Sequence, residues 1–150
     1  MNKIITIFFL AACFTQAQKY DVTIWGIPVG SAEILQGAND EVNFNLKSNE
    51  FIDYFFPVDF EYYSKFDNTN FTIIKNKKTI EQGTEEQSYE AAINNGNVLV
   101  YNEKDSIFLE PNTHSLLSLL IRLMNSPLDS IDTKWFHLEN EGILYKTRLL

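Results

Sequence analysis

The sequence has 150 residues, with 20 aspartates and glutamates against 12 lysines and arginines, and one cysteine. The formal net charge of −8 at pH 7 disfavours binding to nucleic acids and to anionic lipid headgroups, because like charges repel. A single cysteine excludes an intrachain disulfide, so the stability of the fold has to come from its packed core.

The first seventeen residues have the layout of a secretory signal peptide. Lys3 is basic, residues 4–14 are uncharged and mostly apolar, and Ala17 is a small residue at a suitable cleavage position. The apolar run is too short to span a bilayer as a helix. We therefore expect residues 1–17 to direct export to the periplasm or the extracellular space, with residues 18–150 as a single mature domain.

A second processing site lies within the same leader. Residues 10–13 read Leu-Ala-Ala-Cys, which is similar to a bacterial lipobox. Cys13 would then carry a lipid and become the mature N-terminus, and its acyl chains would anchor the domain to a membrane. The leader alone leaves both processing routes open.

Residues 18–150 show the alternation of apolar and polar side chains that is typical of antiparallel strands. Gly26 and Pro28 interrupt the first alternating segment, which predicts a bend or tight turn there. Asn95-Gly96 between two alternating segments predicts a hairpin, because Gly and Asn tolerate the positive φ angles that its turn requires. The expected strands are residues 20–25, 29–35, 42–47, 71–74, 78–81, 89–93, 98–101, 107–109, 135–139 and 143–150.

The most regular pattern lies between residues 52 and 66, where large apolar side chains fall on one parity. This predicts one strand, or two strands bent near Pro57, that present a nearly continuous aromatic stripe on one face. The stripe consists of Ile52, Tyr54, Phe56, Val58, Phe60, Tyr62 and Phe66.

Residues 113–125 are predicted to form the one helix. Apolar side chains surround most of its circumference, which favours a helix embedded in the protein. We therefore expect a mainly β, antiparallel fold in which a curved sheet or half-barrel wraps around one buried helix. In this arrangement the aromatic stripe faces Leu116 and Leu120.

A sheet curved around a helix can leave an apolar cavity between the two. Such a cavity would take a lipid or an acyl chain. The candidate lining residues are Trp25, Tyr54, Phe56, Phe60, Tyr62, Leu116 and Leu120. The alternative is a core that these side chains fill completely, in a structural or interaction protein that acts through its surface or an edge strand.

The sequence predicts no catalytic residue, metal site or cofactor. His114 and His137 lack the spacing of a zinc site, which would need further ligands. Ser115 and Ser118 lie in the predicted helix, whereas a hydrolase nucleophile usually sits on a strained turn. Three carboxylates, which could in principle serve a glycosidase, fall on the polar parity opposite the stripe: Asp53, Asp59 and Glu61.

The sequence stops at Leu150 within an apolar predicted strand that has no polar tail. An exposed apolar edge strand favours pairing with another chain. We expect either that C-terminal strands are missing from this sequence or that the edge binds an envelope protein partner.

Residues 20–32 read Tyr-Asp-Val-Thr-Ile-Trp-Gly-Ile-Pro-Val-Gly-Ser-Ala and resemble the opening of the DUF3108 family of bacterial envelope proteins. Gly26, Gly30 and Ala32 match its small residues. Tyr63-Ser64 with Asp67 resembles the family's middle strand, and residues 117–120 with Arg122 resemble its leucine-rich helix.

The resemblance implies an exported, mainly antiparallel β protein with a half-barrel around a helix, a layout similar to that of the periplasmic lipoprotein carriers LolA and LolB. Members of the family are typically longer, which favours missing C-terminal strands. The resemblance implies no catalytic residue, and a role in binding lipids follows from it only as an analogy of fold.

Overall fold

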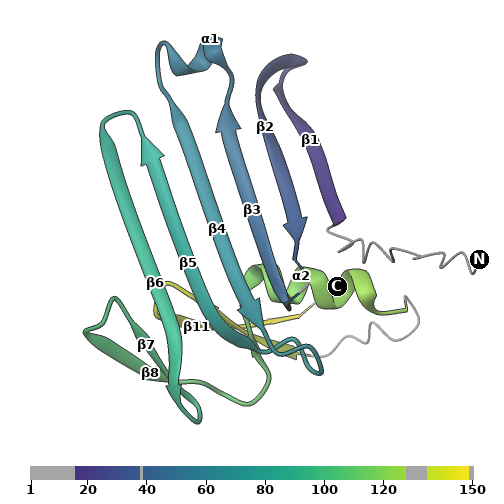
Figure 1. Cartoon of the computed structure of the whole chain (residues 1–150), viewed down its shortest axis with the longest axis vertical. Helices are drawn as coiled ribbons and strands as arrows, with labels where there is room; N and C mark the ends of the chain where they lie inside the picture. Colours follow the sequence, from purple (N-terminus) through teal and green to yellow (C-terminus); the bar gives the residue numbers. More distant parts are fainter. Residues whose placement is uncertain (1–15, 38, 128–134, 149–150) are drawn as a thin grey trace, which may run out of the picture.

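An eight-stranded antiparallel sheet, in which each strand pairs with the next along the chain, forms most of the structure (Figure 1). The computed structural model describes residues 16–37, 39–127 and 135–148. The predicted leader lies outside these residues except for Gln16 and Ala17, which begin the first strand, and so does Cys13. The strands are β1 (Gln16–Ile24), β2 (Ile27–Gln36), β3 (Glu41–Ser48), β4 (Val58–Phe66), β5 (Ile73–Gln82), β6 (Glu85–Asn95), β7 (Val98–Tyr101) and β8 (Asp105–Phe108).

A second, three-stranded sheet and two helices complete the fold. The small sheet has the order β11-β10-β9, with β9 parallel to β10. The predicted class is confirmed, because the protein is mainly antiparallel β; the large sheet is open, with β1 and β8 at its edges. The remaining elements are α1 (Glu50–Asp53), β9 (Thr113–His114), α2 (Leu116–Asn125), β10 (Trp135–Asn140) and β11 (Ile143–Arg148).

The two faces of the large sheet differ in chemistry, because successive side chains of a strand point to opposite faces. One face, called the outer face here, carries charged side chains whose cross-strand ion pairs lie in the solvent. The other, the inner face, carries most of the apolar side chains and packs against α2. The outer-face ion pairs are Lys19–Glu33, Lys47–Asp59, Lys65–Glu41 and Lys75–Glu90.

Helix α2 lies across one end of the inner face, at the bottom of the view in Figure 1. Leu117 and Ile121 of α2 form a buried cluster with Val42, Tyr62 and Phe66 of β3 and β4. Burial of a large aliphatic side chain is worth about 1.5–3 kcal/mol, so this contact holds a ten-residue helix that is marginal alone.

The predicted helix start is wrong by three residues. Thr113 and His114 pair with β10, and Ser115 caps the helix that begins at Leu116. The Ser115 side chain accepts from the Ser118 amide at 3.0 Å, and the Ser118 hydroxyl accepts from the Ser115 amide at 3.0 Å. This reciprocal cap satisfies two amides that would otherwise lack partners at the helix start.

The predicted helix face is also wrong. Leu117 and Ile121 contact the sheet, whereas Leu116 is 59% exposed. An apolar helix offers several possible contact faces, and the hydroxyl-rich cap selects one by placing Ser118 in the buried interior. The helix therefore packs on one end of the large sheet, which is not closed.

The stripe predicted between residues 52 and 66 is confirmed only from Val58 onward. Residues before Pro57 form the short helix α1 and a turn, because the Asn49 side chain accepts from the amide of Ile52 at 3.0 Å and caps a helix. From β4, Tyr62, Ser64 and Phe66 point inward and are buried, as the alternation predicts.

Two turns follow from local sequence. Trp25 and Gly26 both have positive φ, 52° and 79°, and form the tight turn between β1 and β2. This is the turn that Gly26 and Pro28 predict. The hairpin predicted at Asn95-Gly96 is confirmed between β6 and β7, with Gly96 at φ 57°.

The two strands expected at residues 71–74 and 78–81 are one continuous strand, β5.

Candidate functional site

The strands of the large sheet extend well beyond α2 (Figure 1), and their inner-face positions there hold mainly apolar residues. Six side chains lie in cross-strand register in the first row beyond the helix contact, which we call the open row. Its central members are apolar: Ala32 is buried, whereas Leu46, Phe60 and Ile80 are partly exposed. The open row consists of Tyr20, Ala32, Leu46, Phe60, Ile80 and Gln87.

Phe60 joins the open row to the buried cluster. Its ring centroid lies 5.8 Å from that of Phe44 and 6.4 Å from that of Tyr62, both in edge-to-face geometry. The apolar inner face is therefore continuous from the helix contact into the open region.

Helix α2 carries a second apolar surface next to its contact with the sheet. Leu116, Leu120 and Met124 are four residues apart, so they form one stripe along the helix, and all three are exposed. We call this the α2 stripe. Leu116 and Leu120 directly precede Leu117 and Ile121, which makes the stripe the neighbour of the face that contacts the sheet.

The seven predicted cavity residues do not form one cavity. Phe60 and the α2 leucines lie on the two apolar surfaces just described, whereas Tyr62 is 3% exposed and belongs to the packed core. Trp25, Tyr54 and Phe56 lie in turns at the far end of the sheet and are 97%, 84% and 48% exposed.

Sequence reasoning missed Leu46, Ile80 and Met124 as members of the apolar surfaces. The alternation of residues 42–47 already placed Leu46 beside Phe44, so its face could have been inferred. The position of Ile80 depends on the register of β4 with β5, which sets Phe60 opposite Ile80.

A buried polar network joins the large sheet to the small one. Glu139 is 1% exposed, and its Oε1 accepts from the Tyr89 hydroxyl at 2.6 Å and from the Gly142 amide at 2.9 Å. Its Oε2 accepts from Asn76 Nδ2 at 3.0 Å. Burial, followed by the nearby Glu139 carboxylate, raises the pKa of Tyr89, so this hydroxyl stays protonated and donates. The network fixes the β10–β11 hairpin against β5 and β6.

The serines and the histidine that we weighed as hydrolase residues serve the fold. Ser115 caps α2, and its hydroxyl oxygen lies 2.7 Å from that of Ser64 on β4. The neighbouring His114 bonds elsewhere: its Nδ1 contacts the Phe71 carbonyl oxygen at 2.7 Å, and its Nε2 contacts Arg122 Nη1 at 2.8 Å. The serines and the histidine therefore do not form a nucleophile and base pair.

The three carboxylates considered for glycoside hydrolysis also have structural partners or solvent. Asp53 accepts from the Ser48 hydroxyl beside α1, and Asp59 pairs with Lys47 at 2.7 Å. Glu61 is exposed on the outer face. Within residues 16–37, 39–127 and 135–148, no group of three or more histidine, cysteine and carboxylate side chains is arranged to hold a metal ion.

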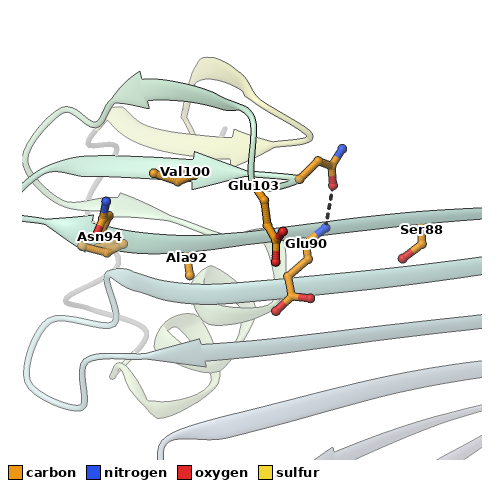
Figure 2. Close-up of a pocket in the computed structure, with 8 residues that line it drawn as sticks. Ser88, Glu90, Ala92, Asn94, Val100 and Glu103 are labelled. Atoms are coloured by element: carbon orange, nitrogen blue, oxygen red, sulfur yellow. Dashed lines mark hydrogen bonds between the residues drawn. The ribbon is translucent and has the colours of Figure 1, made fainter.

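The largest of the described cavities, about 530 Å³, lies on the outer face at β6 and β7 (Figure 2). Glu90 and Glu103 extend into it, and the Glu90 amide donates to Asn102 Oδ1 at 3.1 Å. Because Glu90 also pairs with Lys75 at 2.6 Å, this cavity is a solvated polar groove that shares no residue with the apolar surfaces.

Comparisons with protein-family models, with curated proteins and with solved structures found no match to this chain. The resemblance to the DUF3108 family therefore stays a prediction. None of the described helices has the length and apolar content needed to cross a membrane.

Proposed function

We propose that this chain is an exported, non-enzymatic envelope protein that holds a lipid or another acyl-chain ligand against the open row. The ligand lies in the corner between the inner face of the sheet and the α2 stripe. The observation that carries the proposal is the apolar row that continues the inner face beyond the helix contact, in which Leu46, Phe60 and Ile80 stay partly exposed.

The partly exposed apolar row and the exposed α2 stripe beside it favour an occupant. Contiguous apolar patches beyond a few hundred Å² are uncommon on soluble proteins and usually mark a binding surface. An acyl chain suits this surface, because each methylene removed from water is worth about 0.8 kcal/mol and requires no polar partner. The finer layout that we propose is a half-barrel similar to LolA and LolB, with the ligand above the part of the sheet that α2 leaves open.

The ligand does not insert between α2 and the sheet. Val42, Leu117 and Ile121 are at most 5% exposed and pack in one cluster, so a chain could enter only by displacing the helix. This moves the predicted binding region from the space beneath the helix to the surface beside it.

Native mass spectrometry of protein purified without detergent tests the proposal. We expect a co-purifying mass that lipid extraction identifies as an acyl lipid, and saturable uptake of a fluorescent fatty acid by the stripped protein. A bare polypeptide mass together with no uptake of the fatty acid would refute the proposal.

Two substitutions in the same strand locate the ligand. Ile80 points to the inner face and Thr79 to the outer face, so Ile80→Gln and Thr79→Gln add the same side chain on opposite sides of β5. We expect Ile80→Gln to weaken fatty-acid binding about tenfold, since it removes apolar contact worth about 1.5 kcal/mol. Thr79→Gln should bind like the unchanged protein, and equal losses in both variants would place the ligand elsewhere.

Export and lipidation are tested separately from ligand binding. We expect the full-length chain to appear outside the cytoplasm with residues 1–17 removed. Labelling with radioactive palmitate distinguishes the two processing routes, because only a chain lipidated at Cys13 takes up the label and Cys13→Ala abolishes it.

A second candidate function, from a different class, is a structural or interaction protein that uses an edge strand. The supporting observation is β11, which pairs with β10 on one side only and has exposed Ile143 and Tyr145. A partner strand could add there through main-chain hydrogen bonds. Proline in place of Leu144 should then abolish binding to an envelope protein partner while fatty-acid uptake is unchanged.

A further inference from the structure

On the side of α2 opposite its exposed stripe, a cavity of about 440 Å³ lies between the helix, β10 and two loops. It falls within the usual range for small-molecule sites, about 300–1,000 Å³. Arg122 and Ser126 contribute from α2, and Phe136 and His137 from β10. The other lining residues are Thr69, Asn70, Phe71, Pro111, Asn112, His114 and Trp135.

Charge separates this cavity from the other described cavities. Among the residues that the structure describes, its lining contains no aspartate or glutamate, although the chain has 20 acidic residues. Each of the other four described cavities has at least one carboxylate in its lining. Within residues 16–37, 39–127 and 135–148, the only permanent charge in this lining is therefore positive.

That charge belongs to the Arg122 guanidinium. The structure describes five ion pairs, and Arg122 takes part in none of them. One of its nitrogens, Nη1, contacts His114 Nε2 at 2.8 Å, and one face of the group stacks at 5.3 Å from the ring of Phe136. The remaining N–H groups have no carboxylate partner within the described residues.

His114 orients the guanidinium without neutralising it. Because the Phe71 carbonyl can only accept, Nδ1 of His114 donates to it, and Nε2 of the neutral ring accepts from Arg122. Burial lowers the pKa of His114, and the nearby Arg122 charge lowers it further, whereas the hydrogen bond to Phe71 acts in the opposite direction. The net lowering of the pKa keeps this ring neutral. The guanidinium is thus held in one position and retains its full charge.

We propose that this cavity binds a small organic anion, a carboxylate or a phosphate monoester, through Arg122. The Asn112 amide and the Trp135 indole N–H, which have no partner among the described residues, supply further donors, and Phe136 provides an apolar wall for the carbon skeleton. Guanidinium binds oxyanions through two parallel hydrogen bonds, which explains an arginine at this position. This site lies apart from the acyl-chain surface, so neither proposal depends on the other.

Fluorescence of Trp135 reports directly on the cavity. The chain has two tryptophans, and Trp25→Phe removes the one that lies in the exposed β1–β2 turn. In this variant, titration with sodium phosphate or sodium acetate should change the emission of Trp135 saturably, against sodium chloride at equal ionic strength. A stronger response to phosphate or to acetate assigns the anion class.

Two arginine substitutions separate the cavity from its surroundings. Arg148 lies 5.3 Å from the ring of Trp135 but does not line the cavity, so Arg148→Gln is the matched control for Arg122→Gln. Arg122→Gln removes a pair of charge-assisted hydrogen bonds to the anion, so it should weaken anion binding at least about tenfold. Arg148→Gln should bind within about twofold of its parent, as expected for a cation outside the cavity.

Asn112→Asp tests the cavity without changing Arg122. The variant should fold normally, because Asn112 is exposed and aspartate tolerates its φ of 60°. It places a carboxylate in the lining and should abolish the anion response while the thermal unfolding temperature stays unchanged. The proposal is overturned if no anion gives a response beyond that of chloride, or if Arg148→Gln loses as much as Arg122→Gln. It is also overturned if the well-folded Asn112→Asp variant binds normally.

Discussion

The two ends of the inner face are built from the same strands and the same alternation, yet they differ in what lies above them. Val42, Tyr62 and Phe66 lie under α2 and are at most 3% exposed. In the next row of the same face, Leu46 and Phe60 are only partly buried, and Phe60 packs against the edge of this cluster. The comparison indicates that the covered end stabilises the fold, whereas the open end is where we propose that the ligand binds. Side-chain parity sets the face of a residue, but not whether that face is covered.

The largest expected effect comes from the covered end. Ile121→Ala should lower the free energy of unfolding by about 2–5 kcal/mol, because Ile121 is 1% exposed and its loss leaves a cavity under the helix. The adjacent Leu120→Ala, on the α2 stripe, should cost less than about 1 kcal/mol, since partly exposed side chains contribute less. Urea denaturation measures both losses, and similar values would contradict the distinction between the buried face of α2 and its exposed stripe.

Glu139→Gln should have the next largest effect, a loss of about 1–3 kcal/mol. An amide offers one acceptor oxygen where the carboxylate offers two, so either the Tyr89 hydroxyl or the Asn76 amide loses its buried partner. Glu86→Gln, an identical change at an exposed position, is the control and should stay within about 0.5 kcal/mol. A tolerated Glu139→Gln would show that the polar network does not hold the small sheet in place.

Acid should weaken the covered end through His114. The pKa of His114 is lowered in the folded state, so below pH about 6.5 the unfolded chain binds a proton that the folded chain does not. Its contribution is present above that pH and is lost as the pH falls toward the folded-state pKa. One proton changes stability by at most about 1.4 kcal/mol per pH unit.

The measurement is the free energy of unfolding between pH 7 and pH 5. His114→Gln should reduce the slope of stability against pH, because it removes the buried ring whose folded-state pKa is lowered. An unchanged slope in His114→Gln would assign acid sensitivity to the carboxylates alone.

Particular residues show which features the sequence could predict. The alternation of apolar and polar residues in β3 and β4 correctly places Phe44, Phe60 and Tyr62 on one face of the sheet. Asn95-Gly96 correctly predicts the hairpin between β6 and β7. Both features could be predicted because both signals are local in the sequence. The helix face could not be predicted: Leu116, Leu117 and Leu120 are equally apolar, and the choice among them depends on the distant Ser64–Ser115 contact. Arg122 was visible as a polar position of the helix, but its cavity requires loops more than forty residues away in sequence, such as that of Phe71.

The smallest expected effect tests the limit of the aromatic pattern. Tyr54 has the parity of Tyr62, but the Asn49 cap turns the chain into α1 and leaves Tyr54 84% exposed at the far end of the sheet. Tyr54→Ala should therefore change the free energy of unfolding by less than about 0.5 kcal/mol. It should also leave fatty-acid binding unchanged, because Tyr54 belongs to neither the open row nor the α2 stripe. A clear loss of binding would mean that the ligand reaches past the open row to the α1 turn, so that the aromatic residues before Pro57 belong to the site after all.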